Sequence, residues 1–386
     1  MTKSYLSRRV SQLKPSGIRK FFDIAATMED VISLGIGEPD FDSPKPIIEA
    51  GIRSLKESRT HYTANRGILP LRKALSRHIE KLYGVGYDPE TEIVMTVGGS
   101  EALMIACTAI LDPGDEVILP TPCFVSYQGV IELAGGVCVE VPSRMDNAFM
   151  PDPDELANAV TPKTKAILIN FPCNPTGAVA DENTLQAIAR IAEEHDLVVI
   201  SDEIYDRLVY GVEHICFSAL PGMRERTILV GGFSKDYAMT GWRIGFACAP
   251  REILDGLARV HQYIIMTAPT MAQFGALEGL TCCEDFVENM RAEYDRRRHL
   301  IVEGLNYIGL PTFEPHGAFY AFPQVSVTGL DDQTFADRLL QANRVAVVPG
   351  SAFGPGGEGF VRCSYATAFD QLEEALDRID QFVKSL

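Results

Sequence analysis

The sequence predicts an α/β fold in which a mainly parallel central sheet forms a large domain, beside a smaller α+β domain. From about residue 90 to about residue 250, short apolar runs alternate with helical stretches, the pattern of repeated strand-helix-strand units. The runs are almost continuously apolar, as in parallel strands that are covered on both faces. After about residue 285 the pattern changes to charged helices and a few strand-like runs, which indicates the smaller unit.

The predicted elements follow one another in a regular order. Strands are expected for EIVMTV, DEVILP, KAILIN, LVVIS, TILVGG and RIGFACAP, which are short β-rich runs. Helices are expected for SEALMIACTAIL, VSYQGVIELAG and NTLQAIARIAEEH, which separate these runs. A charged helix, FVENMRAEYDRRRHLIVEGLNYIG, and a final amphipathic helix, AFDQLEEALDRIDQFVKSL, belong to the smaller unit. In a sheet of this kind, functional residues lie at the carboxyl ends of the strands.

The net charge limits the possible partners. The chain has 52 acidic and 35 basic residues, and its formal net charge of −17 would repel nucleic acid and anionic lipid. No apolar run reaches the roughly 18–20 residues that span a membrane, and the start MTKSYLSRRVSQLKPSG lacks the apolar centre of a signal peptide. Nine cysteines without a CxxC pair fit a reducing cytoplasm, where we expect a soluble protein. The histidines form no HxxxH or HxH pattern, so no metal site is indicated.

One stretch at a strand end could bind an anion, and another supplies a fixed asparagine amide. TVGGSEAL places two glycines and Ser100 at the start of a helix, where backbone amides and a hydroxyl suit a phosphate. A glycine turn with a serine cap more often serves folding alone. INFPCNPTG fixes Asn174 between prolines, with a rigid turn closed by an Asx hydrogen bond as the alternative.

Two further stretches supply opposite charges. VVISDEIYDRLVY delivers Asp202, and then Tyr205, from a buried strand, where a carboxylate is costly unless a cation meets it. The alternative for this aspartate is a cap on the next helix. GGFSKDYAMTGWRIGF contains Lys235 and Arg243. A lysine near apolar residues and a second cation can become an amine nucleophile, although most lysines are solvated surface charges.

The combination of these stretches favours a site for pyridoxal phosphate. An anion cradle, an arginine, an aspartate, an asparagine and a lysine all fall at strand ends of one predicted sheet. Together they offer partners for the phosphate, the ring nitrogen, the ring oxygen and the aldehyde of that cofactor.

With these residues in view, the chain resembles the fold-type I pyridoxal-phosphate aminotransferases of class I, and most of all the archaeal-type aromatic and aspartate aminotransferases. The likeness runs from LSRRVSQLKPSGIRKFFD, LGIGEPDF and YTANRGILPLR through NPTG, SDEIY and SKDYAMTGWRIG to HGAFYAFP and VRCSYA. It implies an aspartate-aminotransferase-like fold, with a large domain at residues 46–285 and a small domain formed by 1–45 and 286–386. It also implies a homodimer with shared active sites.

The resemblance implies a role for each residue around the cofactor ring. Lys235 would hold pyridoxal 5'-phosphate as a Schiff base and then carry the transferred proton. Asp202 would pair with the ring nitrogen and keep it protonated. Asn174 and Tyr205 would hydrogen-bond the ring oxygen, and Phe124 would stack on the ring.

The resemblance also implies a set of phosphate ligands. Tyr62 matches a tyrosine that reaches the phosphate of the neighbouring subunit. Gly232 stands where some members have a phosphate-binding serine, so Ser100 is expected to contribute more. Within one chain, the implied ligands are Gly99, Ser100, the amide of Glu101, Ser234 and Arg243.

The substrate would meet three of the expected residues. Arg362 matches the arginine that takes the α-carboxylate bidentately, and Asn174 would lie beside it. Gly37 sits where the family lets the N-terminal segment close over the substrate. The expected catalytic residues are Lys235, Asp202, Tyr205 and Tyr62.

The sequence also predicts features of the backbone and of side-chain packing. Cis peptides are expected at Thr121-Pro122 and Asn174-Pro175, as in family members. Trp242 is expected to pack rather than stack on the cofactor, because Arg243 must face the phosphate and neighbouring strand residues face opposite ways.

The substrate expectation depends on the pocket for the side chain. Aspartate-specific members of the nearest branch tend to carry a lysine at the position of Ser100, and this chain does not. Phe21 and Phe22 could form an apolar lid, or could simply staple the N-terminal segment to the small domain. We therefore expect transfer from an aromatic L-amino acid to 2-oxoglutarate, with aspartate aminotransferase and β-lyase activities as alternatives. A DNA-binding regulator of the same fold is disfavoured, because only about 30 residues precede VISLGIGEPDF.

Overall fold

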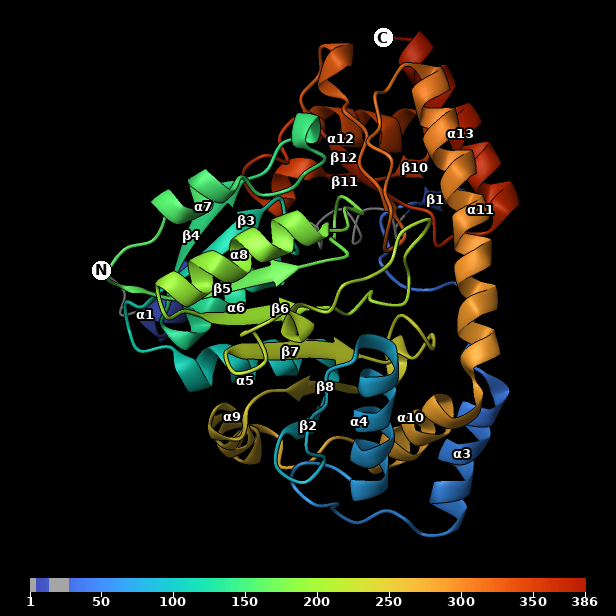
Figure 1. Ribbon diagram of the computed structural model, residues 1–386. Coiled ribbons are helices and arrows are strands. Elements are labelled where there is room, and N and C mark those ends of the chain that lie inside the picture. Colours follow the sequence, from blue (N-terminus) through green and yellow to red (C-terminus); the bar gives the residue numbers. More distant parts are fainter. Residues whose placement is uncertain (1–4, 14–27) are drawn as a thin grey trace.

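The structure is a computed structural model that describes residues 5–13 and 28–386 (Figure 1). A seven-stranded sheet lies at its centre, in the order β2-β8-β7-β6-β5-β3-β4. Of these strands only β8 runs against the others, because it pairs antiparallel with both neighbours. The sheet is therefore mixed and mainly parallel, as predicted. Its strands are β2 (Ile93–Thr96), β3 (Glu116–Thr121), β4 (Val137–Pro142), β5 (Thr164–Asn170), β6 (Val198–Asp202), β7 (Thr227–Gly232) and β8 (Gly245–Cys248).

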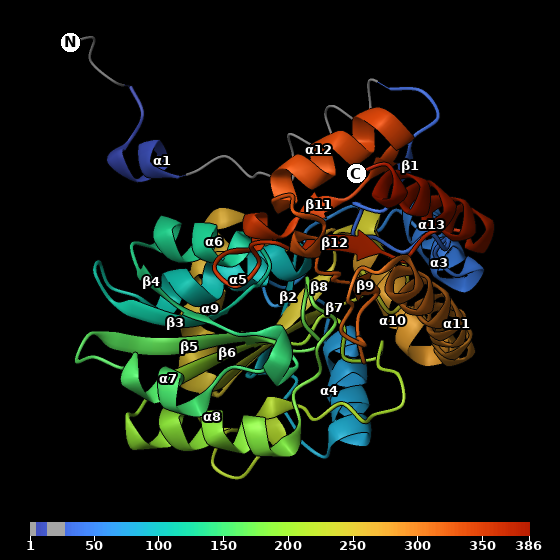
Figure 2. The same ribbon diagram turned by 90° about the horizontal axis from the view of Figure 1, so that it is seen from above.

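Helices cover both faces of this sheet, as Figure 2 shows from above. Helices α5, α6 and α9 form an apolar core on one face, and α7 and α8 form another core on the opposite face. Neighbouring strand residues supply both cores, because Val117 belongs to the first and Ile118 to the second. The helices are α5 (Gly98–Ile110), α6 (Ser126–Ala134), α9 (Arg251–Ile264), α7 (Pro153–Asn158) and α8 (Glu182–Glu194).

Three more helices pack together at the β2 side of the sheet, where they share an apolar core with β2 and β8 (Figure 1). They are α3 (Lys45–Lys56), α4 (Leu69–Tyr83) and α10 (Thr270–Cys282).

The C-terminal part has its own core, which the N-terminal segment joins. Strand β1 (Ile32–Ser33) pairs in parallel with β10 (Val345–Ala346), so the two ends of the chain meet there. A small antiparallel sheet has the order β11-β12-β9. The remaining elements are α11 (Glu284–Ile308), β9 (Tyr320–Ala321), α12 (Asp332–Asn343), β11 (Val348–Pro349), β12 (Val361–Ser364), α13 (Phe369–Lys384), and the separate α1 (Arg8–Gln12) near α6.

Strand β4 was not predicted from the sequence. It is the edge strand of the sheet, and its first four residues are exposed or half-buried. An edge strand needs less apolar cover than a central one, so its sequence pattern is weaker.

The expectation that Arg243 lies in a strand is wrong. Arg243 follows a 3-10 helix at Thr240–Trp242 and has a left-handed backbone, with φ 53°. Trp242 still packs, although the alternation of strand residues does not explain it. A Cβ built on Gly51 of α3 would lie 2.8 Å from the indole, and one on Gly275 of α10 would lie 2.9 Å from it.

The remaining backbone expectations can be compared directly. The cis peptides at Thr121-Pro122 and Asn174-Pro175 are confirmed, and Phe171-Pro172 is a third that was not predicted. Phe21 and Phe22 lie outside the described residues. All nine cysteines are free. Within residues 5–13 and 28–386, no helix is long and apolar enough to cross a membrane.

Candidate active site

A pocket of about 360 Å³ lies at the carboxyl ends of the central strands. Strands β5, β6 and β7 end at or just before pocket residues, and the N-terminus of α5 faces the same space. Of the residues expected from the sequence, the pocket brings together Gly37, Gly99, Ser100, Phe124, Asn174, Asp202, Tyr205, Ser234, Lys235, Arg243 and Arg362.

Lys235 follows the end of β7 and points into this pocket. Its Nζ donates a hydrogen bond to the carbonyl oxygen of Gly37 at 2.6 Å. Burial, together with the positive charges of Arg362 and Arg243, lowers the pKa of the lysine to about 8. An appreciable fraction of the amine is therefore unprotonated near neutral pH, as a nucleophile requires.

Asp202 ends β6 and is buried in the floor of the pocket. Its Oδ2 accepts a hydrogen bond from the Tyr127 hydroxyl at 2.8 Å, and its Oδ1 accepts the Ile204 amide at 3.2 Å. Burial raises the pKa of this carboxyl to about 6, although the bond from Tyr127 acts in the opposite direction. Among the described residues it forms no salt bridge, so this buried carboxyl can pair with a cationic group of a bound ligand.

The first turn of α5 and Arg243 form an anion cradle. The N-cap residue Val97 has no side-chain acceptor for the first turn, which leaves backbone amides directed at the pocket. Gly98 has a φ of 72°, and a Cβ there would lie 2.9 Å from Nη2 of Arg243. Glycine therefore allows the guanidinium to lie against the helix start. Among the described residues Arg243 pairs with no carboxylate and donates to the Thr240 carbonyl oxygen at 2.8 Å.

Arg362 projects from β12 at the other side of the pocket. Its Nη1 donates to Asn174 Oδ1 at 2.8 Å, and its Nη2 donates to the Gly35 carbonyl oxygen at 2.6 Å. The ring of Tyr320 lies under the guanidinium at 4.4 Å, and its hydroxyl is 2.8 Å from that of Tyr205. The arginine is thus held in one orientation while Nε lacks a partner in the described structure. A substrate carboxylate would compete for Nη2 with the Gly35 carbonyl oxygen.

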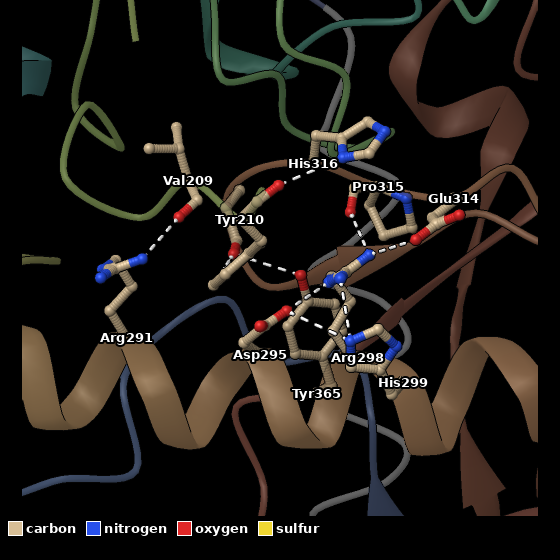
Figure 3. Close-up of polar contacts among 11 residues, drawn as sticks. Val209, Tyr210, Arg291, Asp295, Arg298, His299, Glu314, Pro315, His316 and Tyr365 are labelled. Atoms are coloured by element: carbon tan, nitrogen blue, oxygen red, sulfur yellow. Dashed lines mark hydrogen bonds and ion pairs between the residues drawn. The ribbon is translucent and has the colours of Figure 1, made fainter. Parts of the chain in front are cut away.

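A polar network around Arg298 holds the segment that carries Tyr320 (Figure 3). Arg298 of α11 bonds Asp295 and Glu314 at 2.8 Å each, and also donates to the Pro315 carbonyl oxygen. The Tyr210 hydroxyl donates to the Ala318 carbonyl oxygen. Because Arg298 is buried, these bonds anchor residues 314–318 firmly before β9 begins.

Two expected residues are not in the pocket. Tyr62 is 80% exposed on the outside of the chain. The side chain of Glu101 turns away toward His261, and only its amide was expected to bind phosphate. Gly232 could not be a serine without a shift, because a Cβ there would lie 2.8 Å from Ile204 Cδ1.

Among the pocket residues that were not predicted, three form side-chain hydrogen bonds with predicted site residues: Asn170, Tyr127 and Tyr320. Asn170 ends β5, and its amide group bonds the Asp202 carbonyl oxygen and the Asn174 N–H. The strand-end rule that selected Asp202 could have found it. Tyr127 comes from a helix, and Tyr320 comes from a strand of the small sheet, so no local signal marked either.

Known proteins resemble this chain along nearly its whole length. The model of the family "Aminotransferase class I and II" matches residues 29–379. An aspartate aminotransferase of Pyrococcus abyssi is 49% identical over 98% of both chains, and an aromatic-amino-acid aminotransferase of Thermococcus litoralis is 47% identical with the same coverage. The crystal structure of an aromatic aminotransferase from Pyrococcus horikoshii has a TM-score of 0.91 at 47% identity, covering 95% of this chain and 99% of that one. The chain is therefore an aminotransferase of the class I and II family, which uses pyridoxal 5'-phosphate and has the aspartate aminotransferase fold.

Proposed function

We propose that this aminotransferase moves the amino group of an aromatic L-amino acid to 2-oxoglutarate. The observation that carries the proposal is the set of cations in the pocket. Lys235, Arg243 and Arg362 are the lysine and arginine side chains that line it within the described residues. Each already has a role in holding the cofactor or the α-carboxylate, and Ser100 offers no charge to a second carboxylate.

The pocket residues fit the cofactor by their chemistry. When bound, pyridoxal 5'-phosphate withdraws electrons from Cα of the substrate. The buried Asp202 carboxylate suits the ring nitrogen, and Asn174 and Tyr205 suit the ring oxygen. Phe124 lines the same space and suits the ring face. The cradle of Gly99, Ser100, the Glu101 amide, Ser234 and Arg243 suits the phosphate.

The protein side chains then divide the work of the reaction. Lys235, with its lowered pKa, would accept and hold the proton that leaves Cα of the substrate. Arg362 orients the substrate by binding its α-carboxylate through two N–H groups, next to Asn174 and Gly37. Tyr320 stabilises that orientation through a cation–π contact between its ring and the Arg362 guanidinium.

We also propose a homodimer in which Tyr62 serves the partner's site. Tyr62 and Tyr263 are 80% and 84% exposed, and Ile264 and Met266 are exposed beside Tyr263. Asn65 donates to the Met266 carbonyl oxygen at 2.9 Å, which ties the loop of Tyr62 to this apolar turn. Such an exposed apolar patch, on a chain whose own pocket does not contain Tyr62, suits contact with a second copy.

The expected domain division is a proposal too: residues 46–285 as the large domain, with 1–45 and 286–386 as the small one. It is supported by the position of the pocket, which Lys235 and Asp202 line from one part and Arg362 and Tyr320 from the other.

A donor panel tests the substrate. With 2-oxoglutarate fixed, kcat/KM is measured for phenylalanine, tyrosine, tryptophan and aspartate, and the aromatic donors are expected to be faster. Ser100→Lys should shift the ratio of aspartate to phenylalanine upward, because it adds the missing cation. If aspartate exceeds every aromatic donor in wild type by more than about tenfold, or ~1.4 kcal/mol, the aromatic assignment is wrong.

A second assay separates transamination from β-lyase chemistry on the same cofactor. Cystathionine is offered without a 2-oxo acid, and pyruvate and ammonia are measured against conversion of the cofactor to its amine form. We expect conversion of the cofactor without pyruvate. Stoichiometric pyruvate over many turnovers would instead identify a β-lyase.

A further inference from the structure

A buried histidine–carboxyl contact lies next to the anion cradle. Glu101 is in the first turn of α5, and its Oε1 is 2.7 Å from Nδ1 of His261 on α9. The imidazole is completely buried, and the carboxylate is 8% exposed. The second carboxylate oxygen, Oε2, accepts the backbone N–H of Val97 at 2.5 Å. His261 is therefore connected, through one side chain, to the turn where β2 passes into α5.

A purely apolar contact between α5 and α9 would be simpler. Nε2 of His261 has no hydrogen-bond partner among the described residues, which is costly for a fully buried polar atom. The neighbouring Leu257, on the same helix, packs in the apolar core of α5 and α9 without such a cost. The histidine is thus a poor choice for packing alone, and its one bond goes to Glu101.

The turn that this pair holds has little freedom. Gly98 sits against the Arg243 guanidinium, and a Cβ built on Gly245 would lie 2.7 Å from the carbonyl carbon of Gly98. Without His261, the Glu101 carboxyl group would no longer be held in its present orientation. Its bond to the Val97 N–H would then break, and the turn would shift. The amides of Gly99 and Ser100 would then move relative to Arg243.

We propose that His261 is a positioning residue, which fixes the 97–101 turn through Glu101 and thereby sets the affinity of the cradle for the cofactor phosphate. The inference rests on the proposed function, which assigns the phosphate to this turn. It concerns a side chain that touches neither the cofactor nor the substrate.

The test compares two ligands of the cofactor-free enzyme: pyridoxal 5'-phosphate and pyridoxal, which lacks the phosphate. His261→Leu is expected to raise the dissociation constant for pyridoxal 5'-phosphate by about tenfold, the loss of one buried hydrogen bond, and to leave the dissociation constant for pyridoxal unchanged. Glu101→Ala should behave in the same way. His261→Gln keeps an N–H donor and should stay within about threefold of wild type.

Leu257→Ala is the matched control for packing between α5 and α9. It should lower the melting temperature while the ratio of the two dissociation constants stays at the wild-type value. The inference is overturned if His261→Leu and Glu101→Ala keep that ratio, or if Leu257→Ala changes it equally. If wild type itself binds both ligands alike, the assignment of the cradle to the phosphate fails, and the inference fails with it.

Discussion

Lys235 and Asp202 occupy the same pocket, and burial shifts both toward their neutral forms. The pKa of the lysine falls to about 8 and that of the aspartate rises to about 6, with burial as the largest cause in each case. These shifts disfavour folding of the empty protein, because the charged forms lose hydration. Under the proposed roles of these residues, a bound cofactor with a cationic ring nitrogen and an aldehyde would relieve both costs.

Lys235→Ala is expected to remove nearly all turnover. Loss of the proton carrier alone should lower kcat by roughly 10²–10⁴-fold. The visible absorption band of the lysine-bound cofactor should disappear while the far-ultraviolet circular dichroism is unchanged. Lys45→Ala, at an exposed lysine, is the control and should keep both the band and the activity. An Lys235→Ala enzyme that retains the band would show that another amine holds the cofactor.

Asp202→Asn should stabilise the cofactor-free protein at neutral pH. Because the folded pKa of about 6 lies above the unfolded value of 3.8, the contribution of Asp202 to the free energy of unfolding falls as pH rises from about 4 through about 6. At pH 7 the variant is expected to gain up to ~3 kcal/mol in the free energy of unfolding, and nothing below pH 4. Urea unfolding at both pH values checks this, and an equal effect at pH 4 would contradict it. Turnover of the variant should fall by orders of magnitude.

At the scale of elements, the site is made by close contact between the start of α5 and β8. A Cβ on Gly245 would lie 2.7 Å from the carbonyl carbon of Gly98 and 2.8 Å from the Gly99 nitrogen. Backbone atoms cannot rotate away as a side chain can. The contact therefore depends on a glycine in β8, and it places the helix N-terminus beside Arg243.

Gly245→Ala is expected to push α5 away from β8, at a cost of about 1–3 kcal/mol in the free energy of unfolding. Cofactor affinity should also fall, because the cradle moves away from Arg243. Gly241→Ala is the matched control, since a Cβ there meets nothing within 4 Å, and it should change neither quantity. If Gly245→Ala kept wild-type stability and cofactor affinity, β8 and the start of α5 could not lie as close together as this structure places them.

On the scale of the whole molecule, the pocket collects side chains from distant parts of the chain but leaves Tyr62 outside. Gly37 and Arg362 come from opposite ends of the sequence, and Lys235 donates to the first while the second donates to Gly35. Tyr62 faces away beside an exposed apolar turn. A complete site would then need two copies of the chain.

Subunit complementation tests the shared site. Lys235→Ala and Tyr62→Ala chains, purified separately, should each be impaired, because each homodimer repeats its defect in both sites. A mixed dimer places both changes in one site and leaves the other intact. Mixing after partial unfolding should therefore raise the activity well above the sum of the two variants. Activity equal to that sum would place Tyr62 outside the partner's site.

Much of the architecture is encoded locally. Near-continuous apolar runs predict the parallel strands, because a strand covered on both faces needs apolar residues on both. Asp202, Asn174 and Lys235 could be selected in advance, since ligand-binding residues gather at the carboxyl ends of such strands. Edge strand β4 escaped the same reasoning, because exposure removes the pattern.

What only the tertiary structure decided are the contacts between residues far apart in the chain. Tyr127 bonds Asp202 across 75 positions, and Arg362 bonds Asn174 across 188. The spacing of apolar residues, every 2 residues in a strand or every 3.6 in a helix, predicts neither pairing. It indicates only which face of a single element is buried. The pKa shifts of Lys235 and Asp202 belong here too, because burial is a property of the assembled fold and not of either residue's neighbours in sequence.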